Sequence, residues 1–318
     1  YPDSLAEIAH LIEPKLPIID GKVGFLLGKN ATNDGLYSVF SGANNHLDLL
    51  NVITEFQNST TIPYYDEPCN EIRGTNGELY PPFFDAPPES IEIFSPVMCR
   101  PWPLHRNGST TVRGINSVVF SSGEDLFTKT NNETMDRCFE KMPYMNGVKG
   151  TFDASACQFG QPIVITLPHF FKADPELHKL VTGLEPDARK HDFSLSVFEF
   201  GIVTDLQVRL QVNIPVRVRP GANTGPLILY PIWWQELIFL EQDRNKLSDI
   251  IWDQAVRPKV LIQSFLIGLG LLLIATFIIV AITFYIIDRK GKTPDDDELL
   301  RDEERVERRF EVSDRLSR

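Results

Sequence analysis

The sequence predicts a mixed, mainly β-stranded domain joined to one membrane-spanning helix, and two stretches of the chain carry this prediction. The first is Val260–Ile287, which runs for 28 residues without a charged side chain. The second is Leu206–Val218, in which apolar and polar side chains alternate with a period of two, as in a strand with one apolar face. We therefore expect a β-rich domain before the helix and a short tail after it.

The uncharged stretch is long enough to cross a membrane. As a helix it would measure about 42 Å, more than the roughly 30 Å of a bilayer's hydrocarbon core, so it can span with some tilt. Arg257 and Lys259 flank one end, and Arg289, Lys290 and Lys292 flank the other. The alternative is a buried core helix, but such helices rarely stay apolar on every face over this length.

The span divides the chain into three parts. We predict that residues 1–259 form an exoplasmic or lumenal ectodomain, that residues 260–287 form the transmembrane helix and that residues 288–318 form a cytoplasmic tail. Four N-x-[ST] sequons precede the span and none follows it, which favours a glycosylated ectodomain. The acceptor residues are Asn30, Asn58, Asn107 and Asn132. No signal peptide is visible, so we expect a segment upstream of Tyr1 to be missing from this sequence.

The four cysteines all lie in the predicted ectodomain, at Cys69, Cys99, Cys138 and Cys157. An even number in an oxidising compartment predicts two disulfides, and the sequence alone leaves three connectivities open. No CxxC spacing occurs, so a zinc or redox site is not expected. Four buried free thiols are the alternative.

The chain before the long alternating stretch is predicted to form short strands separated by polar loops. Loops are predicted at 58–90, 107–114 and 128–134, where Pro, Gly, Asn and hydroxyl residues are concentrated. A short capped helix is predicted at Ser4–Leu11, and a strand, a turn and a second strand at Gly21–Gly42. Further strands are predicted at Ile91–Val97, Ile115–Ser122, Pro162–Phe170 and Phe193–Val197.

The alternating stretch is the longest predicted strand. Its 13 residues would extend about 43 Å, a length that suits a barrel or a curved sheet. The residues of its apolar face are Leu206, Val208, Leu210, Val212, Ile214, Val216 and Val218. The residues of its polar face are Gln207, Arg209, Gln211, Asn213, Arg217 and Arg219. Another strand is predicted at Leu227–Trp234, and an amphipathic helix at 240–256 leads to the span.

Two classes of function are disfavoured by composition and motifs. The net charge is −12, and no basic stripe with interleaved aromatic residues is present, which argues against nucleic acid. GxSxG, HExxH, Walker and GxGxxG motifs are absent, so we expect neither an enzyme nor a cofactor or metal. His169 follows Pro168 at a strand end, where a structural role is expected, and His178 and His191 are predicted to be solvated in a polar loop.

The predicted tail contains one readable motif. Asp295–Leu300 fits the acidic dileucine pattern, in which an acidic residue stands four positions before two leucines. Leu299 and Leu300 offer an apolar anchor, and the carboxylate of Asp295 offers a partner for a basic groove such as that of a clathrin adaptor. The alternative is a chance match in an acidic tail. Glu304 and Arg308 stand at i,i+4 and predict a partly helical tail.

Several motifs between Gly24 and the span occur in one order and together resemble the class B scavenger receptor family. The longest is Cys157–Phe170 (CQFGQPIVITLPHF), and Gly183–His191 follows with the pattern Gly-Leu-Glu-Pro-x4-His. Leu210–Asn213 and Pro231–Glu236 match as well. The chain resembles the C-terminal two thirds of that family.

The resemblance implies a fold and a set of disulfides. The fold is a large antiparallel, β-barrel-like ectodomain with short helices, crossed by an apolar tunnel and anchored in the membrane by a helix at each terminus. The implied pairs are Cys69 with Cys138 and Cys99 with Cys157. The candidate wall of this core or tunnel consists of Leu206, Val208, Leu210, Val212 and Ile214.

The resemblance also implies a function. We expect a scavenger-type receptor that binds lipids (fatty acids, sterols, phospholipids) or lipoprotein-like particles and transfers lipid to the membrane without covalent chemistry. The alternative is a receptor that recognises and sorts a protein partner in endosomes or lysosomes. The expected location is the plasma membrane or an endosomal or lysosomal membrane. The residues that capture ligands are expected upstream of Tyr1.

Overall fold

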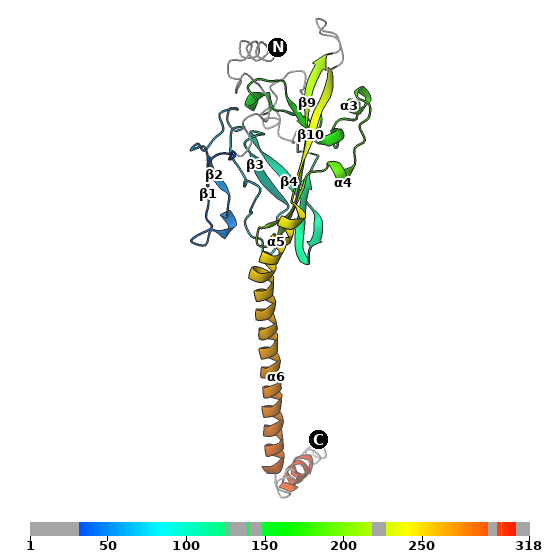
Figure 1. Cartoon of the computed structure of the whole chain (residues 1–318). Coiled ribbons are helices and arrows are strands. Elements are labelled where there is room, and N and C mark those ends of the chain that lie inside the picture. The colour runs from blue at the N-terminus through cyan, green and yellow to red at the C-terminus, as the bar shows by residue number, and fades with distance from the viewer. Residues whose placement is uncertain are drawn as a thin grey trace, which may run out of the picture. The chain divides into compact units, whose positions relative to one another are not determined.

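The computed structural model describes residues 32–124, 126–127, 139, 148–217, 227–291, 298–299 and 301–309. The chain forms two compact units, Tyr1–Asp249 and Ile250–Arg318, which are taken separately below. Figure 1 labels strands β1–β4, β9 and β10 of the first unit and helix α6 of the second. The predicted helix Ser4–Leu11, the predicted loop 128–134 and the first strand predicted within Gly21–Gly42 lie outside the described residues.

The first unit is built on an eight-stranded sheet with the order β3-β4-β5-β8-β9-β7-β6, in which β10 also pairs with β9. Every pairing in this sheet is antiparallel. The predicted mainly antiparallel β-fold is therefore confirmed. The strands are β3 (Ser90–Ser95), β4 (Arg100–Val112), β5 (Ile115–Ser122), β6 (Phe152–Asp153), β7 (Val164–Thr166), β8 (Ser194–Phe198), β9 (Val203–Arg217) and β10 (Leu227–Ile238).

Strand β9 is the longest strand and organises the sheet. One of its edges pairs with β10 from Gln207 to Arg217, so the two strands lie side by side in Figure 1. Its other edge pairs first with β8, up to Gln207, and then with β7, at Gln211–Asn213. The long alternating pattern of the sequence thus corresponds to a strand that is long enough to pair with three others, β7, β8 and β10.

The sheet is open among the described residues. Strand β3 stands at one end of the order, and neither β6 nor β10 pairs with it, so the strands do not close into a barrel. The barrel-like closure implied by the family resemblance is therefore not present in this part of the chain. The mixture of an antiparallel sheet with short helices agrees with the prediction.

One predicted loop is a strand. Residues 107–114 were expected to form a loop, but β4 continues through them to Val112 and pairs with β5 down to Val112↔Ile115. The Asn and Gly residues that suggest a loop instead form a bulge between Arg106 and Ser109, where Gly108 adopts a φ of 88°. Glycine tolerates this left-handed conformation without steric cost.

Short elements complete the first unit. A two-stranded antiparallel sheet joins β1 (Tyr37–Val39) to β2 (Ile53–Phe56), and β1 confirms the second strand predicted within Gly21–Gly42. No strand lies between β2 and β3, as expected for the predicted loop at 58–90. Before β10, the helical segments among the described residues are η1 (Leu47–Leu49), η3 (Ser155–Cys157), η4 (Pro168–Phe170), α3 (Pro175–Leu180) and α4 (Ala188–His191).

The side chains of the first unit pack into a main apolar cluster and two smaller ones. The main cluster contains buried residues of β4, β5, β8 and β9, among them Trp102, Phe120, Leu195 and Leu210. A second cluster joins β7 to η4 and α3 on a different side of the sheet. A third surrounds Cys99 and includes Ile53 and Phe94. Burial of this apolar surface is the main force that stabilises the unit.

The second unit is mainly helical. Helix α5 (Glu241–Ile251) begins in the first unit, and a π-helical turn, η5 (Trp252–Val256), leads into α6 (Arg257–Gly291). This confirms the helix predicted before the span. Helix α6 contains all of Val260–Ile287, buries none of its residues and is long and apolar enough to cross a membrane. Residues 301–309 are also helical, and Glu304 pairs with Arg308 at 2.9 Å as predicted.

Candidate ligand-binding core

The predicted wall residues of β9 lie against the main apolar cluster, with one exception. Leu210 and Val212 are buried within the cluster, and Leu206 and Val208 pack against it while partly buried. Ile214 belongs to the same face of the strand but is 39% exposed. The structure therefore brings four of the five predicted side chains together and leaves Ile214 beyond the cluster.

Aromatic rings of other strands complete this apolar region. The indole of Trp102 in β4 packs edge to face with Phe127 and Phe193, at centroid distances of 5.4 and 5.8 Å. Trp233 of β10 packs against the same cluster from the strand beside β9. The region thus combines aliphatic side chains on β9 with aromatic rings, which is a suitable lining for an acyl chain or a sterol.

One of the buried polar groups in this region is the indole N–H of Trp102. Trp102 is 2% exposed, and its indole Nε1–H meets no acceptor in the part of the chain that the structure describes. A buried donor without an acceptor costs about 1–3 kcal/mol, so such groups call for an explanation. The carbonyl, carboxylate or hydroxyl oxygen of a lipid could accept this bond.

The opposite face of β9 differs from the prediction. A half-buried strand was expected, but the polar side chains of Arg209, Gln211 and Asn213 are buried as well. The reason is that the segment from η4 to α4 lies over them, and the main-chain N–H of His169 in η4 donates to Gln211 Oε1 at 2.9 Å. We call these three residues the polar face of β9.

The polar face of β9 satisfies its hydrogen bonds with β7. Asn213 Nδ2 donates to the carbonyl oxygen of Val164 and to Thr166 Oγ1, each at 3.0 Å. Gln211 Nε2 donates to Asn213 Oδ1 at 2.8 Å and to Thr166 Oγ1 at 3.3 Å. These bonds replace the water that the amides would contact in the unfolded chain, so the network fixes the register of β7 against β9.

The charged member of the polar face is Arg209. Its Nε pairs with Glu236 Oε1 of β10 at 2.7 Å, and Nη1 donates to the carbonyl oxygens of Arg189 and Asp192 at 3.1 and 3.2 Å. The guanidinium therefore ties β9, β10 and α4 together. Asp192 is itself ion-paired with Lys172 at 3.1 Å, which anchors the end of the same segment.

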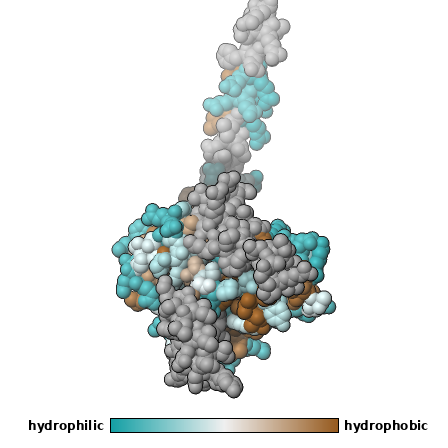
Figure 2. All heavy atoms as spheres, turned by 90° about the horizontal axis from the view of Figure 1, so that it is seen from above, coloured by the Kyte–Doolittle hydropathy of each residue, from teal (hydrophilic) through white to brown (hydrophobic). Residues whose placement is uncertain are grey.

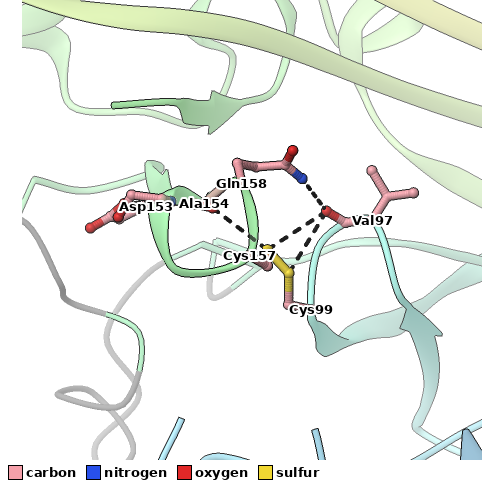
Figure 3. Close-up of a disulfide and its surroundings, with 7 residues drawn as sticks. Val97, Cys99, Asp153, Ala154, Cys157 and Gln158 are labelled. Atoms are coloured by element: carbon pink, nitrogen blue, oxygen red, sulfur yellow. Dashed lines mark hydrogen bonds between the residues drawn. A yellow bond between two sulfur atoms is a disulfide. The ribbon is translucent and has the colours of Figure 1, made fainter. Parts of the chain in front are cut away.

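A disulfide braces the cluster around Cys99. Cys99 is bonded to Cys157, which is the pairing that the family resemblance implies (Figure 3). The bond closes a separation of 58 residues, and the chain-entropy model gives such a loop about 4 kcal/mol of stabilisation. Gln158 Nε2 donates to the carbonyl oxygen of Val97 at 3.0 Å across the same junction. Cys69 is also disulfide-bonded, and its implied partner Cys138 lies outside the described residues.

Two of the four predicted glycosylation sites are described, and both are exposed. Asn58 lies just after β2, and Asn107 lies at the bulge of β4, where its Nδ2 donates to Ser121 Oγ at 2.9 Å. Asn30 and Asn132 lie outside the described residues. Figure 2 shows hydrophilic residues over much of the described surface seen from above, with smaller apolar areas between them.

Of the three residues named in the predicted sorting motif, Asp295, Leu299 and Leu300, the structure describes Leu299, which is 65% exposed. Asp295 and Leu300 lie outside the described residues. An exposed leucine on a charged tail is available to a partner.

In the part of the chain that the structure describes, an antiparallel sheet with an apolar core, a disulfide and a helix long and apolar enough to cross a membrane occur together, as is typical of a membrane-anchored protein. Comparison with known proteins agrees: the model of the CD36 family matches residues 1–284, and the chain belongs to that family. It is a family of membrane receptors, not of enzymes.

Three relatives show the breadth of the family. The chain is 31% identical to scavenger receptor class B member 1 of Mus musculus over 88% of this chain and 55% of the relative. It is 28% identical to sensory neuron membrane protein 2 of Anopheles gambiae, over 79% of this chain and 47% of that protein. It is 23% identical to lysosome membrane protein 2 of Mus musculus, over 79% of this chain and 52% of that protein. The chain thus spans about half the length of these curated relatives.

Proposed function

We propose that this protein is a scavenger-type membrane receptor that binds lipid or lipoprotein-like ligands and passes lipid through the interior of its ectodomain to the bilayer. Residues 1–259 would be exoplasmic or lumenal, 260–287 would span the membrane, and 288–318 would be cytoplasmic. Fatty acids, sterols and phospholipids are the ligands that an apolar conduit would accept. The location would be the plasma membrane or an endosomal or lysosomal membrane.

The observation that carries this proposal is the apolar face of β9. Leu206, Val208, Leu210 and Val212 present a continuous aliphatic row to aromatic rings of neighbouring strands, and the row includes two side chains that are only partly buried. The unsatisfied donor of Trp102 in the same cluster supports a ligand with an apolar body and a polar oxygen. Membership of a receptor family and the long apolar helix α6 support transfer to a membrane.

A matched pair of substitutions on one strand tests the proposal. Val208→Phe adds bulk where β9 contacts the main cluster, whereas Val216→Phe adds the same bulk on the same face at a side chain that is 45% exposed. In receptor-null cells that express the full-length protein, we expect Val208→Phe to reduce uptake of labelled fatty acid and sterol several-fold. Val216→Phe should retain uptake near that of the wild type.

Overpacking at Val208 can itself destabilise the protein by about 1–3 kcal/mol, so the comparison is made at equal amounts of protein at the cell surface. Mass spectrometry of lipids extracted from each purified variant provides a second measurement, in which only Val208→Phe should lose co-purifying lipid. Uptake that is equal in null cells with and without the wild-type receptor would contradict the proposal, as would equal losses in the two variants.

A second function is favoured by the exposed tail leucine, namely sorting of a protein partner through endosomes or lysosomes. The double variant Leu299→Ala with Leu300→Ala should move the receptor toward the cell surface, because it removes the apolar anchor for an adaptor. Val306→Ala is the matched control, since Val306 is also exposed on the tail helix. Surface biotinylation measures the distribution, and an unchanged distribution of the double variant would contradict a sorting role for the tail.

A further inference from the structure

Two histidines form a stacked pair over the polar face of β9. The rings of His169 in η4 and His191 in α4 lie 4.2 Å apart with an interplanar angle of 18°. Trp234 of β10 meets both rings edge to face, at 6.5 and 6.0 Å. His191 is 4% exposed, so the prediction that it is solvated was wrong. The sequence pattern could not reveal this, because the two histidines are 22 positions apart in the chain.

Both rings accept main-chain hydrogen bonds from one short segment. His169 Nδ1 accepts the N–H of Glu185 at 3.0 Å, and His191 Nδ1 accepts the N–H of Asp187 at 2.9 Å. A ring nitrogen that accepts a bond must keep its lone pair, so this geometry requires neutral imidazoles that carry their proton on Nε2. The two bonds tie the turn before α4 to the histidine pair.

The surroundings of His191 oppose a positive charge. Burial, together with the neighbouring His169, lowers the pKa of His191, and the positive charges of Arg209 and Lys190 act in the same direction. The carboxylate of Asp187 acts in the opposite direction and raises the pKa. The other charged or titratable groups around the pair are His178 of α3, Glu185 and Arg189 of the α4 segment, Asp192 after α4, Lys172 after η4 and Glu236 of β10.

The segment that carries His169 is strained. His169 and Phe170 both adopt a φ of 55°, in the left-handed region that non-glycine residues rarely occupy. Such conformations cost on the order of 1–3 kcal/mol each and persist only where the surroundings hold them. Here the bond from His169 N–H to Gln211 and the stacking on His191 hold the strained turn in place.

We propose that the His169–His191 pair is an acid-sensitive latch, which holds Gly183–Asp192 against the polar face of β9 at neutral pH and releases it in an acidic compartment. A proton on His191 Nδ1 would turn an acceptor into a donor that faces the N–H of Asp187. It would also place a buried positive charge beside Arg209. Release would uncover Arg209, whose Nη1 donates to the carbonyl oxygens of Arg189 and Asp192 in this segment.

The direction of the pH dependence follows from the linkage between proton binding by His191 and opening of the segment. Because the pKa of His191 is lower in the closed segment than in the open one, the open form binds more protons in acid. The stabilisation of the closed latch is therefore complete above the ordinary histidine pKa of about 6.5 and is lost as the pH falls below it. For one histidine, the equilibrium constant for opening can rise by at most about 30-fold between pH 7.4 and pH 5.

Hydrogen exchange of the full chain in detergent micelles tests the latch directly. The reporters are the amides of Glu185 and Asp187, since their N–H groups are the donors to the two rings. After correction for intrinsic exchange rates, we expect their protection to fall about 10- to 30-fold from pH 7.4 to pH 5. Amides of β8, such as that of Val197, should keep their protection over the same range.

Three variants separate titration from loss of structure. In His191→Gln, the amide oxygen can still accept the N–H of Asp187 but does not titrate, so the pH dependence should disappear. His169→Gln offers a second test if His191→Gln does not fold. His46→Gln, at an exposed histidine, should behave as the wild type. Protection that is independent of pH in the wild type, or an undiminished pH dependence in both His169→Gln and His191→Gln, would overturn the proposal.

Discussion

From Arg209 to Asn213 both faces of β9 are buried, but they are built differently. On one face, Leu210 and Val212 contact other apolar side chains and make no directional bonds. On the other, Arg209, Gln211 and Asn213 are held by hydrogen bonds to β7, β10 and the α4 segment. An apolar face tolerates changes of shape and can accept a ligand, whereas a bonded network specifies one arrangement.

This difference suggests how one strand serves two purposes. The hydrogen bonds of the polar face fix the position of β9 in the sheet. The apolar face therefore does not have to fix it and can present an apolar surface to a ligand. Substitutions on the polar face should therefore act on stability, and substitutions on the apolar face should act on stability and lipid transfer together.

The largest effect is expected for Arg209→Ala. The substitution leaves Glu236 without its partner and removes the donor to the carbonyl oxygens of Arg189 and Asp192. Hydrogen bonds from a charged donor contribute about 1.5–3 kcal/mol each, and Arg209 makes three, so we expect the free energy of unfolding to fall by about 4 kcal/mol in chemical denaturation. Arg209→Lys should recover only part of this, since an ammonium cannot make the same fork of bonds. A loss below about 1 kcal/mol would show that the network is not cooperative.

A smaller effect is expected for Leu210→Ala on the apolar face. Truncating a buried leucine usually costs about 2–5 kcal/mol, and we expect about 3 kcal/mol because the side chain is 8% exposed. Ile214→Ala is the matched control on the same face, and at 39% exposure it should change stability by less than about 1 kcal/mol. Thermal denaturation of the purified variants measures both, and equal losses would mean that the apolar cluster extends past Val212.

The smallest effect is expected for Thr166→Val, which keeps the shape of a fully buried side chain and removes only its hydroxyl. Thr166 Oγ1 accepts bonds from Gln211 and Asn213, so its loss should cost about 1–2 kcal/mol. Lipid uptake should not change, because the hydroxyl lies on the polar face. A selective loss of uptake at unchanged stability would contradict the division of roles between the faces.

Much of the fold could be predicted because period-two patterning is a local property. The strand at Ile115–Ser122, the span Val260–Ile287 and residues 206–217 of the strand predicted at Leu206–Val218 lie within elements of the expected type, and Val218 lies outside the described residues. The bulge at Gly108 was missed because Asn and Gly favour loops and bulges alike. What distinguishes a bulge from a loop here is the pairing of β4 with β5, which the residue preferences at 107–108 do not report.

The candidate site was only half predictable. The apolar row of β9 could be read from the sequence, whereas the burial of its polar row depends on η4 and α4, which lie over it only in the folded chain. The sequence does contain one signal of this burial. Gln211 and Asn213 are uncharged amides, and residues 207–213 include no Lys or Glu, the residues that commonly line a solvated strand face. The stacked pair of His169 and His191 left no such signal.

The most direct test of the account is photo-crosslinking of the full-length receptor with diazirine-bearing fatty acid and sterol, followed by mapping of the labelled peptides. The account predicts labels on the apolar row from Leu206 to Val212 and on the facing Trp102, in addition to those in α6. Val208→Phe should reduce the labels on β9 and leave those in α6 unchanged. Labelling confined to α6, with none on β9 in the wild type, would contradict the claim that the core of the ectodomain carries lipid.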